Sequence, residues 1–336
     1  MTIAHTEARF AIWVPRRTLL ALGLGLAYAL FVVLFPWDEI SKGGFTDFEA
    51  YVSDFDFYAS ADLSKADMYQ LTSLKDLLFS EFLWHELVKN MTRAIGDAAT
   101  ALRLLSFVTL FVWGAFLFRR VGFGIALLFL FNPMVIDVAM SAIRNGFAWA
   151  LVLIGLSVRS RILRALLFVV GTLIHTSTLV LLVIYYGVRM MTRVLKGTRI
   201  LALGAAGLGA SIGLAVTFGR ALLTEAIGDR RTSEDYIVGG GSLLQASLWA
   251  ILLLLQCLSG RDYIRRNAFI IAVLGWYLAM NPFIPFSYRI WGAFLPPIAV
   301  AALELPPRFK QLFLYLYPGY LGLQYFYWTK FFEGWY

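Results

Sequence analysis

The chain has 336 residues, of which 60% are hydrophobic and only 15% are charged. A soluble domain is nearer half apolar and one quarter charged, so this composition excludes an ordinary soluble protein. The net charge of +8 does not indicate nucleic-acid binding, because the basic residues lie in short loops between apolar runs. That placement is the charge signal of membrane topology.

Apolar runs long enough to cross a bilayer as helices, about 20 residues, recur along the chain. They lack the alternation of barrel strands, so they are predicted to be α-helices. The sequence therefore predicts an all-α, polytopic membrane bundle with about nine to ten spans, which forms a single transmembrane domain over residues 1–336. The spans are expected near 18–36, 99–118, 121–140, 143–158, 200–219, 243–260, 267–284, 287–304 and 311–328.

The first apolar run is expected to remain as a helix, because Arg16 and Arg17 precede it but no small-residue cleavage site follows it. Basic residues cluster in alternate loops, which predicts a cytoplasmic N-terminus. Two loops are then outside. The acidic loop 37–98 is expected to contain an amphipathic helix near 79–95, and the second outer loop is 220–242.

The segment 165–188 has the length of one span, but clusters of basic residues flank both ends. A single crossing would place one cluster outside. We therefore predict a broken, re-entrant helix in which 165–174 enters, the chain turns at His175-Thr176-Ser177, and 178–188 returns. Each half would have about 10 residues, or roughly 15 Å of helix, which is half the bilayer core. Non-helical backbone at that depth requires a protein or water lining, so His175 is expected to lie in a cavity.

Two arginines lie at the predicted outer ends of helices. Arg144 follows a helix break expected at Asn132-Pro133, and Arg289 follows a second proline-rich break at 281–287. The simplest interpretation of each arginine is an interfacial anchor, and Arg144 is alternatively a partner of Asp137. The functional interpretation is a pair of guanidinium groups that bind phosphate oxygens.

His175 has a simple interpretation as a buried neutral histidine that is hydrogen-bonded to a carbonyl or to Ser177. The predicted helix break favours a functional role instead, in which a desolvated neutral imidazole accepts a proton from a hydroxyl. Asp47 and Glu81 in the first outer loop are alternative catalytic groups. The neighbours expected to support the site are Asn145, Ser177 and Tyr288.

The first outer loop also contains Asp54-Phe55-Asp56, which is a weak motif for a divalent metal. An acidic, solvated loop produces this pattern by chance. The sequence holds no His/Cys metal spacing, P-loop, dinucleotide fingerprint or Gly-x-Ser-x-Gly elbow. We therefore expect neither a metal nor another cofactor.

Several stretches occur in the order seen in one family of membrane proteins. Thr46-Asp47-Phe48-Glu49-Ala50-Tyr51 resembles the Thr-Asp-Tyr-x-x-Tyr stretch of EpsG-like proteins, and Ile143-Arg144-Asn145-Gly146-Phe147-Ala148 resembles their Ile-Arg-Gln-Gly-x-Ala stretch. Next, His175-Thr176-Ser177 resembles their His-x-Ser. The departures are Asn145 for glutamine and Phe48 for tyrosine. Weaker matches are Glu81-Phe82-Leu83-Trp84 and Tyr288-Arg289, and Asp38-Glu39 resembles glycosyltransferases of the GT-C type.

The resemblance to the EpsG-like branch of Wzy-type polysaccharide polymerases implies a function. An O-antigen or exopolysaccharide polymerase of this kind joins undecaprenyl-pyrophosphate-linked oligosaccharide units on the periplasmic face of the bacterial inner membrane. The implied architecture is GT-C-like. The implied partners are the lipid-linked donor and acceptor, membrane lipids and, as a further candidate, a chain-length regulator protein. No nucleic-acid partner is expected.

A mechanism follows as an expectation. Arg144 and Arg289 would stabilise the charge that develops on the leaving pyrophosphate. His175 is the preferred general base for the acceptor hydroxyl, with Asp47 or Glu81 as alternates, and attack opposite the leaving group would invert the anomeric centre. Two rival functions remain open. One is a lipid-linked oligosaccharide flippase, since transporters also use broken helices. The other is a different polyprenyl-linked-sugar glycosyltransferase or an O-antigen ligase.

Overall fold

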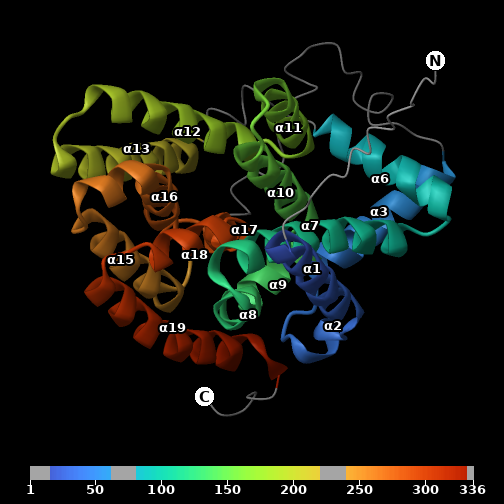
Figure 1. Cartoon of the computed structure of the whole chain (residues 1–336). Coiled ribbons are helices and arrows are strands. Elements are labelled where there is room, and N and C mark those ends of the chain that lie inside the picture. Colours follow the sequence, from blue (N-terminus) through green and yellow to red (C-terminus); the bar gives the residue numbers. More distant parts are fainter. Residues whose placement is uncertain (1–15, 62–80, 220–239, 331–336) are drawn as a thin grey trace, which may run out of the picture.

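The computed structural model describes residues 16–61, 81–219 and 240–330, and this part of the chain is almost entirely helical (Figure 1). The one extended pairing among the described residues is an isolated antiparallel bridge between Ser41 and Thr329. The prediction of an all-α fold is confirmed. The elements are α1 (Arg16–Leu34), α2 (Trp37–Ile40), α3 (Thr46–Ser60), α6 (Phe82–Ile95), α7 (Ala98–Val121), α8 (Phe123–Leu130), α9 (Pro133–Met140), α10 (Ile143–Ser157), α11 (Arg161–Ile174), α12 (Ser177–Val194), α13 (Thr198–Phe218), α15 (Leu243–Cys257), α16 (Arg261–Met280), η3 (Pro285–Ser287), α17 (Tyr288–Ala293), α18 (Leu295–Leu303) and α19 (Pro307–Trp328).

In the described part of the chain, four helices are long and apolar enough to cross a membrane: α1, α7, α12 and α13. Two bent pairs, α8 with α9 and η3–α17 with α18, raise the number to six if each pair is one span. Among the described residues, α10 and α15 are shorter apolar helices. The chain is thus built as a multi-pass membrane protein, whereas the total of nine to ten spans stays a prediction.

Polar caps fix where several helices begin. The Asp97 side chain accepts a hydrogen bond from the Thr100 amide at 2.7 Å and starts α7. Asn132 accepts one from the Met134 amide at 2.9 Å and starts α9, with Pro133 in the first turn. Each cap satisfies an amide that has no partner inside its helix, which explains these boundaries.

Proline breaks two of the predicted spans. The expected break at Asn132-Pro133 is confirmed, because α8 and α9 meet at 65°. The prediction of one continuous helix at 287–304 was wrong, because η3–α17 and α18 meet at 66°. Pro296 and Pro297 lie in the first turn of α18 and have no amide hydrogen to bond to the turn before, so the helix cannot continue.

The break predicted within 165–188 is present, since α11 ends at Ile174 and α12 begins at Ser177. The predicted half-helix lengths were wrong. The first helix has 14 residues and the second has 18, or roughly 21 Å and 27 Å of helix. Each therefore spans most of a bilayer core of about 30 Å instead of half of it.

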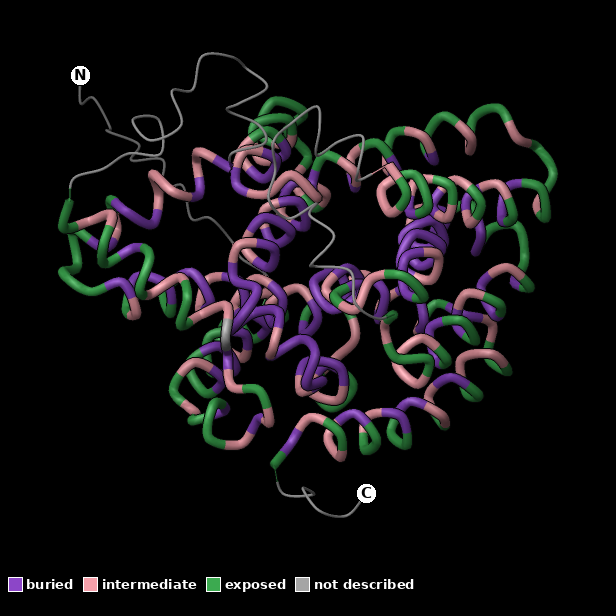
Figure 2. The backbone as a smooth tube through the Cα atoms, turned by 180° about the vertical axis from the view of Figure 1, so that it is seen from behind, coloured by how far each residue is buried: buried purple, intermediate pink, exposed green. Residues whose placement is uncertain are grey.

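Two helix pairs form the body of the bundle, with α1 packed along α7 and α13 packed along α16. The α13–α16 pair is close because Gly209 faces the second helix, where an added Cβ would overlap the Ala272 carbonyl oxygen. Small residues at such seams let membrane helices approach closely. Figure 2 shows buried residues concentrated in the helices of the interior, with exposed residues on those of the periphery.

The connection between α1 and α7 lies on one side of the molecule, opposite the hairpin of α12 and α13 (Figure 1). The amphipathic helix predicted at 79–95 is present as α6, which begins at Phe82, and the acidic stretch before it forms α3. The outer loop predicted at 220–242 falls largely outside the described residues.

Candidate functional site

Glu81 joins the two most specific predicted residues into one cluster. One carboxylate oxygen of Glu81 forms an ion pair with Arg144, and the other lies 2.6 Å from His175 Nδ1. The Glu81 side chain is 1% exposed, whereas those of Arg144 and His175 are each 17% exposed. The carboxylate is therefore enclosed, while the basic groups on either side of it remain partly accessible.

Local backbone geometry places these three side chains. Arg144 is the second residue of α10, directly after the chain turns out of α9. His175 occupies the extended position between α11 and α12. Glu81 precedes α6 in the left-handed conformation, with φ 55°, and it is the only non-glycine residue with positive φ in the described part of the chain. Such a conformation costs about 1–2 kcal/mol for a residue with a Cβ, and such strain is commonly stored at functional sites.

Arg289 and Asp47 form a second, more open ion pair. Their Nη2 and Oδ2 atoms are 2.7 Å apart, and the side chains are 29% and 32% exposed. Arg289 is the second residue of α17, just after the proline-rich break, and Asp47 lies in the first turn of α3. Both carboxylates that pair with the two arginines thus come from the connection between α1 and α7.

Asn145, the residue after Arg144, connects the Arg144–Glu81 pair to the region of the Arg289–Asp47 pair. Its amide nitrogen donates to the Arg289 backbone oxygen at 3.1 Å, and its amide oxygen accepts from the Ser177 hydroxyl at 3.3 Å. The Ser177 hydroxyl in turn accepts from the Trp149 indole at 3.1 Å. These contacts connect α10, α17 and α12. The structure therefore brings together residues that the sequence separates by more than one hundred positions.

The eighth predicted residue, Tyr288, donates a hydrogen bond from its hydroxyl to Asp137 Oδ2 at 2.9 Å. The predicted alternative of an Arg144–Asp137 pair is wrong, because Arg144 pairs with Glu81. Apart from that alternative, Asp137 was not expected in the site. Its signal in the sequence is a carboxylate inside an apolar run, one turn after a proline break.

The two arginines have closely similar surroundings. The Arg144 guanidinium lies over the Tyr51 ring at 5.8 Å, and that of Arg289 lies over the Phe286 ring at 5.1 Å. In both, Nε is buried and has no hydrogen-bond partner among the described residues. Burial raises the pKa of Tyr51, and the positive charge of Arg144 opposes that rise. Each guanidinium is thus held by a carboxylate and an aromatic face, with one buried donor still unused.

This arrangement has two chemical capacities. The guanidinium groups can bind anionic oxygens, provided that these replace or share the contacts with Glu81 and Asp47. The carboxylate at Nδ1 favours the His175 tautomer that carries its proton there, which places the lone pair on Nε2. A histidine held in this way can accept a proton from a hydroxyl.

The described residues contain no group of three or more His, Cys, Asp and Glu side chains arranged to hold a metal ion. In the Asp54-Phe55-Asp56 stretch, Phe55 is buried in the core and Asp56 Oδ1 accepts a hydrogen bond from the Ala98 amide at 3.2 Å. This stretch therefore joins α3 to α7. Asp38 and Glu39, exposed in α2, lie outside the cluster.

No family model, curated protein or solved structure matches this chain. Support for a function therefore comes from the residues of the site.

Proposed function

We propose that the protein is a membrane glycosyltransferase that joins undecaprenyl-pyrophosphate-linked oligosaccharide units, a polysaccharide polymerase of the Wzy type. The observation that supports this most strongly is the meeting of Arg144, Arg289 and the Glu81–His175 pair in one cluster, bridged by Asn145. Ionisable groups inside a membrane bundle are costly and usually functional. A purely structural bundle does not require this set.

The two guanidinium groups bind the diphosphate of the lipid-linked donor. As the bond from the anomeric carbon to the diphosphate breaks, the electron pair stays on the leaving oxygen and its negative charge grows. Preorganised cations that face this oxygen stabilise the transition state more than the bound substrate. The unused, buried Nε donors of Arg144 and Arg289 favour an additional acceptor at both groups.

His175 is the general base. It takes the proton from a sugar hydroxyl of the acceptor while that oxygen bonds to the anomeric carbon from the face opposite the diphosphate. Glu81 orients the imidazole and stabilises its protonated form, as the carboxylate does in other carboxylate–histidine pairs. Because both Glu81 oxygens are engaged, Glu81 is assigned to positioning. Asp47 forms the corresponding ion pair with Arg289.

The proposed architecture is a GT-C-like bundle with its site at the periplasmic end. Asp47 and Glu81 belong to the connection between α1 and α7, so the site lies at the end of the bundle where α1 finishes. The end of α19 meets the same region, because the Lys42 amide donates to the Trp328 backbone oxygen at 2.9 Å. With the N-terminus in the cytoplasm, this end faces the periplasm.

The test uses a strain that lacks this gene and is complemented with the wild type, Arg144→Ala, Arg289→Ala or the control Arg308→Ala. Arg308 is exposed at the start of α19. At equal levels of inserted protein, we expect the wild type and the control to make long surface polysaccharide. The two site variants should leave single repeat units on the outer leaflet.

Full-length polymer from Arg144→Ala and Arg289→Ala would overturn the diphosphate assignment. Precursor trapped on the inner leaflet of the deletion strain would identify a flippase instead. A third outcome is polymer of normal length that is not attached to its final acceptor, which would identify a ligase. Each result therefore separates the proposal from one of its rivals.

A further inference from the structure

Asp137 is a carboxylate of this cluster that the mechanism above does not use. Its Oδ2 accepts the 2.9 Å hydrogen bond from the Tyr288 hydroxyl. It also lies within electrostatic range of Arg289 and Asp47. Asp137 is therefore hydrogen-bonded to the residue that directly precedes Arg289, the group proposed to bind the leaving diphosphate.

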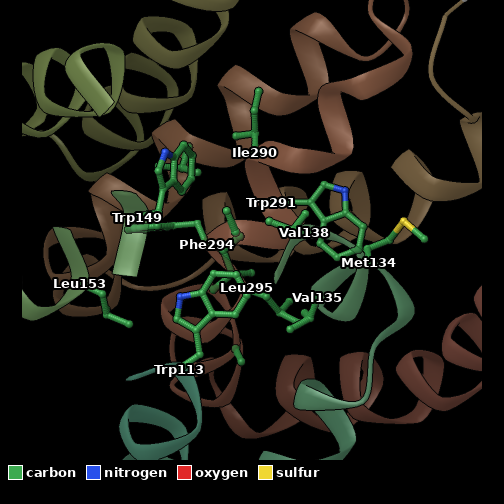
Figure 3. Packing of buried hydrophobic residues seen from close by; sticks show 14 of the residues in the cluster. Trp113, Met134, Val135, Val138, Trp149, Leu153, Ile290, Trp291, Phe294 and Leu295 are labelled. Atoms are coloured by element: carbon green, nitrogen blue, oxygen red, sulfur yellow. The ribbon is translucent and has the colours of Figure 1, made fainter. Parts of the chain in front are cut away.

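The packing of α9 against α17 fixes this position. A Cβ added at Gly292 would lie 3.0 Å from Val138 Cγ2 and 3.2 Å from the Met134 carbonyl oxygen, so the two helices touch there. Figure 3 shows Met134 and Val138 beside Trp291 in the same contact. One turn before Gly292, Tyr288 meets Asp137. The close approach at the glycine thus sets the distance between the tyrosine and the carboxylate.

Asp137 differs from the other two carboxylates of the site. Glu81 and Asp47 each form an ion pair with an arginine, whereas Asp137 forms none with the described residues. Its Oδ1 accepts no hydrogen bond from them. This oxygen can therefore accept a contact from a ligand.

We propose that Asp137 contacts the sugar that is attached to the donor diphosphate, and that its negative charge stabilises the positive charge developing at the anomeric carbon. This inference rests on the proposed function. The sugar is bonded to the diphosphate that Arg289 binds, so its ring lies next to that arginine. Glycosyl transfer proceeds through an oxocarbenium-like transition state, which a nearby carboxylate stabilises.

The reaction balances without a bond to Asp137. The bond from the anomeric carbon to the diphosphate oxygen breaks with its electron pair on oxygen, and the acceptor oxygen bonds to that carbon. The acceptor proton goes to His175. Asp137 keeps its charge throughout, with Arg289 on the side where negative charge grows. The two residues together therefore stabilise the charge separation of the transition state.

The experiment compares the wild type with Asp137→Asn and Tyr288→Phe, each as full-length protein in lipid nanodiscs. The asparagine keeps the shape and the acceptor oxygen for Tyr288 but removes the charge. The phenylalanine keeps the charge but removes the hydrogen bond that orients it. Transfer is measured with a synthetic polyprenyl-diphosphate oligosaccharide as both donor and acceptor. Binding of inorganic pyrophosphate is measured separately.

For Asp137→Asn we expect kcat to fall by about 10²-fold, the usual effect of removing one preorganised electrostatic group, with KM and pyrophosphate affinity nearly unchanged. For Tyr288→Phe we expect a smaller loss of kcat, about tenfold, again without a change in pyrophosphate affinity. The second variant provides the test even if the first one does not insert into the membrane.

A wild-type kcat in either folded variant would overturn the role of Asp137. A parallel loss of kcat and of pyrophosphate affinity would also overturn it, because that pattern indicates a purely structural role near Arg289. If instead the wild type bound pyrophosphate but transferred no sugar, the proposed function itself would fail. The two failures are therefore distinguishable.

Discussion

Each arginine of the site is neutralised by one carboxylate before any ligand arrives. Arg289 pairs with Asp47 across 2.7 Å with both side chains nearly one third exposed, and Arg144 pairs with the enclosed Glu81. The proposed diphosphate ligand would have to compete with both contacts. This competition would keep its affinity below what two unpaired guanidinium groups would give.

The Asp47→Asn and Glu81→Gln variants separate this competition from catalysis. Because an exposed ion pair contributes about 1 kcal/mol, Asp47→Asn should raise the affinity for inorganic pyrophosphate by about fivefold. It should change kcat little, because the ion-pair partner of Asp47 is Arg289 and the proposed general base is His175. Glu81→Gln should raise that affinity as well, but it also removes the charge that orients His175. We therefore expect its kcat to fall by about 10²-fold.

Calorimetric titration with pyrophosphate and a transfer assay on the same preparations check both expectations. Weaker pyrophosphate binding in Asp47→Asn would mean that Asp47 positions Arg289 for the ligand and does not compete with it. An unchanged kcat in Glu81→Gln would remove His175 as the general base, since Glu81 would then have nothing to orient.

The sequence singled out the residues that the structure brings together in this cluster, but it did not predict how they pair. Arg144, His175 and Arg289 stand out because ionisable groups are rare in apolar runs. Such a pattern can be recognised from the sequence alone. Glu81 was expected to be an alternative catalytic group. Its contact with both Arg144 and His175 depends on a left-handed residue at the start of α6 and on how α6 packs, which no local pattern encodes.

At the scale of elements, helix breaks were predictable where proline follows a capping residue, as at Asn132-Pro133. The break before α18 was also present in the sequence, in Pro296 and Pro297, but the apolar run around them concealed it. Helix lengths on either side of His175 were less predictable. In an apolar sequence the end of a helix depends on the partner that it packs against, not on composition.

The seam between α13 and α16 depends on Gly209. We predict that Gly209→Val prevents stable packing of the two helices, because its side chain would overlap the backbone of Ala272 and neither backbone can move aside. The control is Gly207→Val, two residues away, where an added Cβ meets nothing within 4 Å. Thermal unfolding in detergent should show a lower midpoint for Gly209→Val alone, and equal midpoints would refute close packing at this seam.

The start of α7 should make a pH-dependent contribution to stability. Hydrogen bonds from Thr100 hold the pKa of Asp97 below its usual 3.8. Since the folded-state pKa is the lower one, this contribution is fully present above the unfolded value and is lost as the pH falls through the folded value. Asp97→Asn keeps a capping oxygen but does not titrate.

The midpoints of thermal unfolding of the wild type and Asp97→Asn should therefore differ by a constant amount above about pH 5 and converge below pH 4. Because Asp97 is exposed, the difference should be small. A difference that does not vary with pH would show that the titration of Asp97 makes no contribution to stability.

At the scale of the whole molecule, a backbone hydrogen bond and an ion pair join segments that the charge pattern places on the same side. The Gly241 amide donates to the Asn281 backbone oxygen at 2.6 Å, and both lie in predicted outer connections. At the opposite ends of the helices, Arg266 Nε lies 3.8 Å from Glu304, and both are predicted to be cytoplasmic. These pairs agree with helices that alternate in direction through the bundle.

The path of α11 and α12 determines how deep the site lies. If both helices have their basic ends in the cytoplasm, their lengths of roughly 21 Å and 27 Å carry His175 beyond the midplane of a core of about 30 Å. The imidazole then lies near the periplasmic boundary, at the level of the connection that supplies Asp47 and Glu81. A sugar hydroxyl can reach such a position from water, whereas a site at the midplane would require the sugar to enter the bilayer.

Labelling with a membrane-impermeant thiol reagent tests this path. Cys257 is first replaced by serine, and a single cysteine then replaces Arg161, Lys196 or Glu39. All three positions are exposed: Arg161 lies on α11, Lys196 lies between α12 and α13, and Glu39 lies on α2. We expect the first two to react from the cytoplasmic side and the third from the periplasmic side. Reaction of the cysteines at 161 and 196 from opposite sides would make α11–α12 a single crossing. One of the two flanking clusters of basic residues would then lie on the periplasmic side. The position of His175 near the periplasmic boundary would no longer follow from the lengths of α11 and α12.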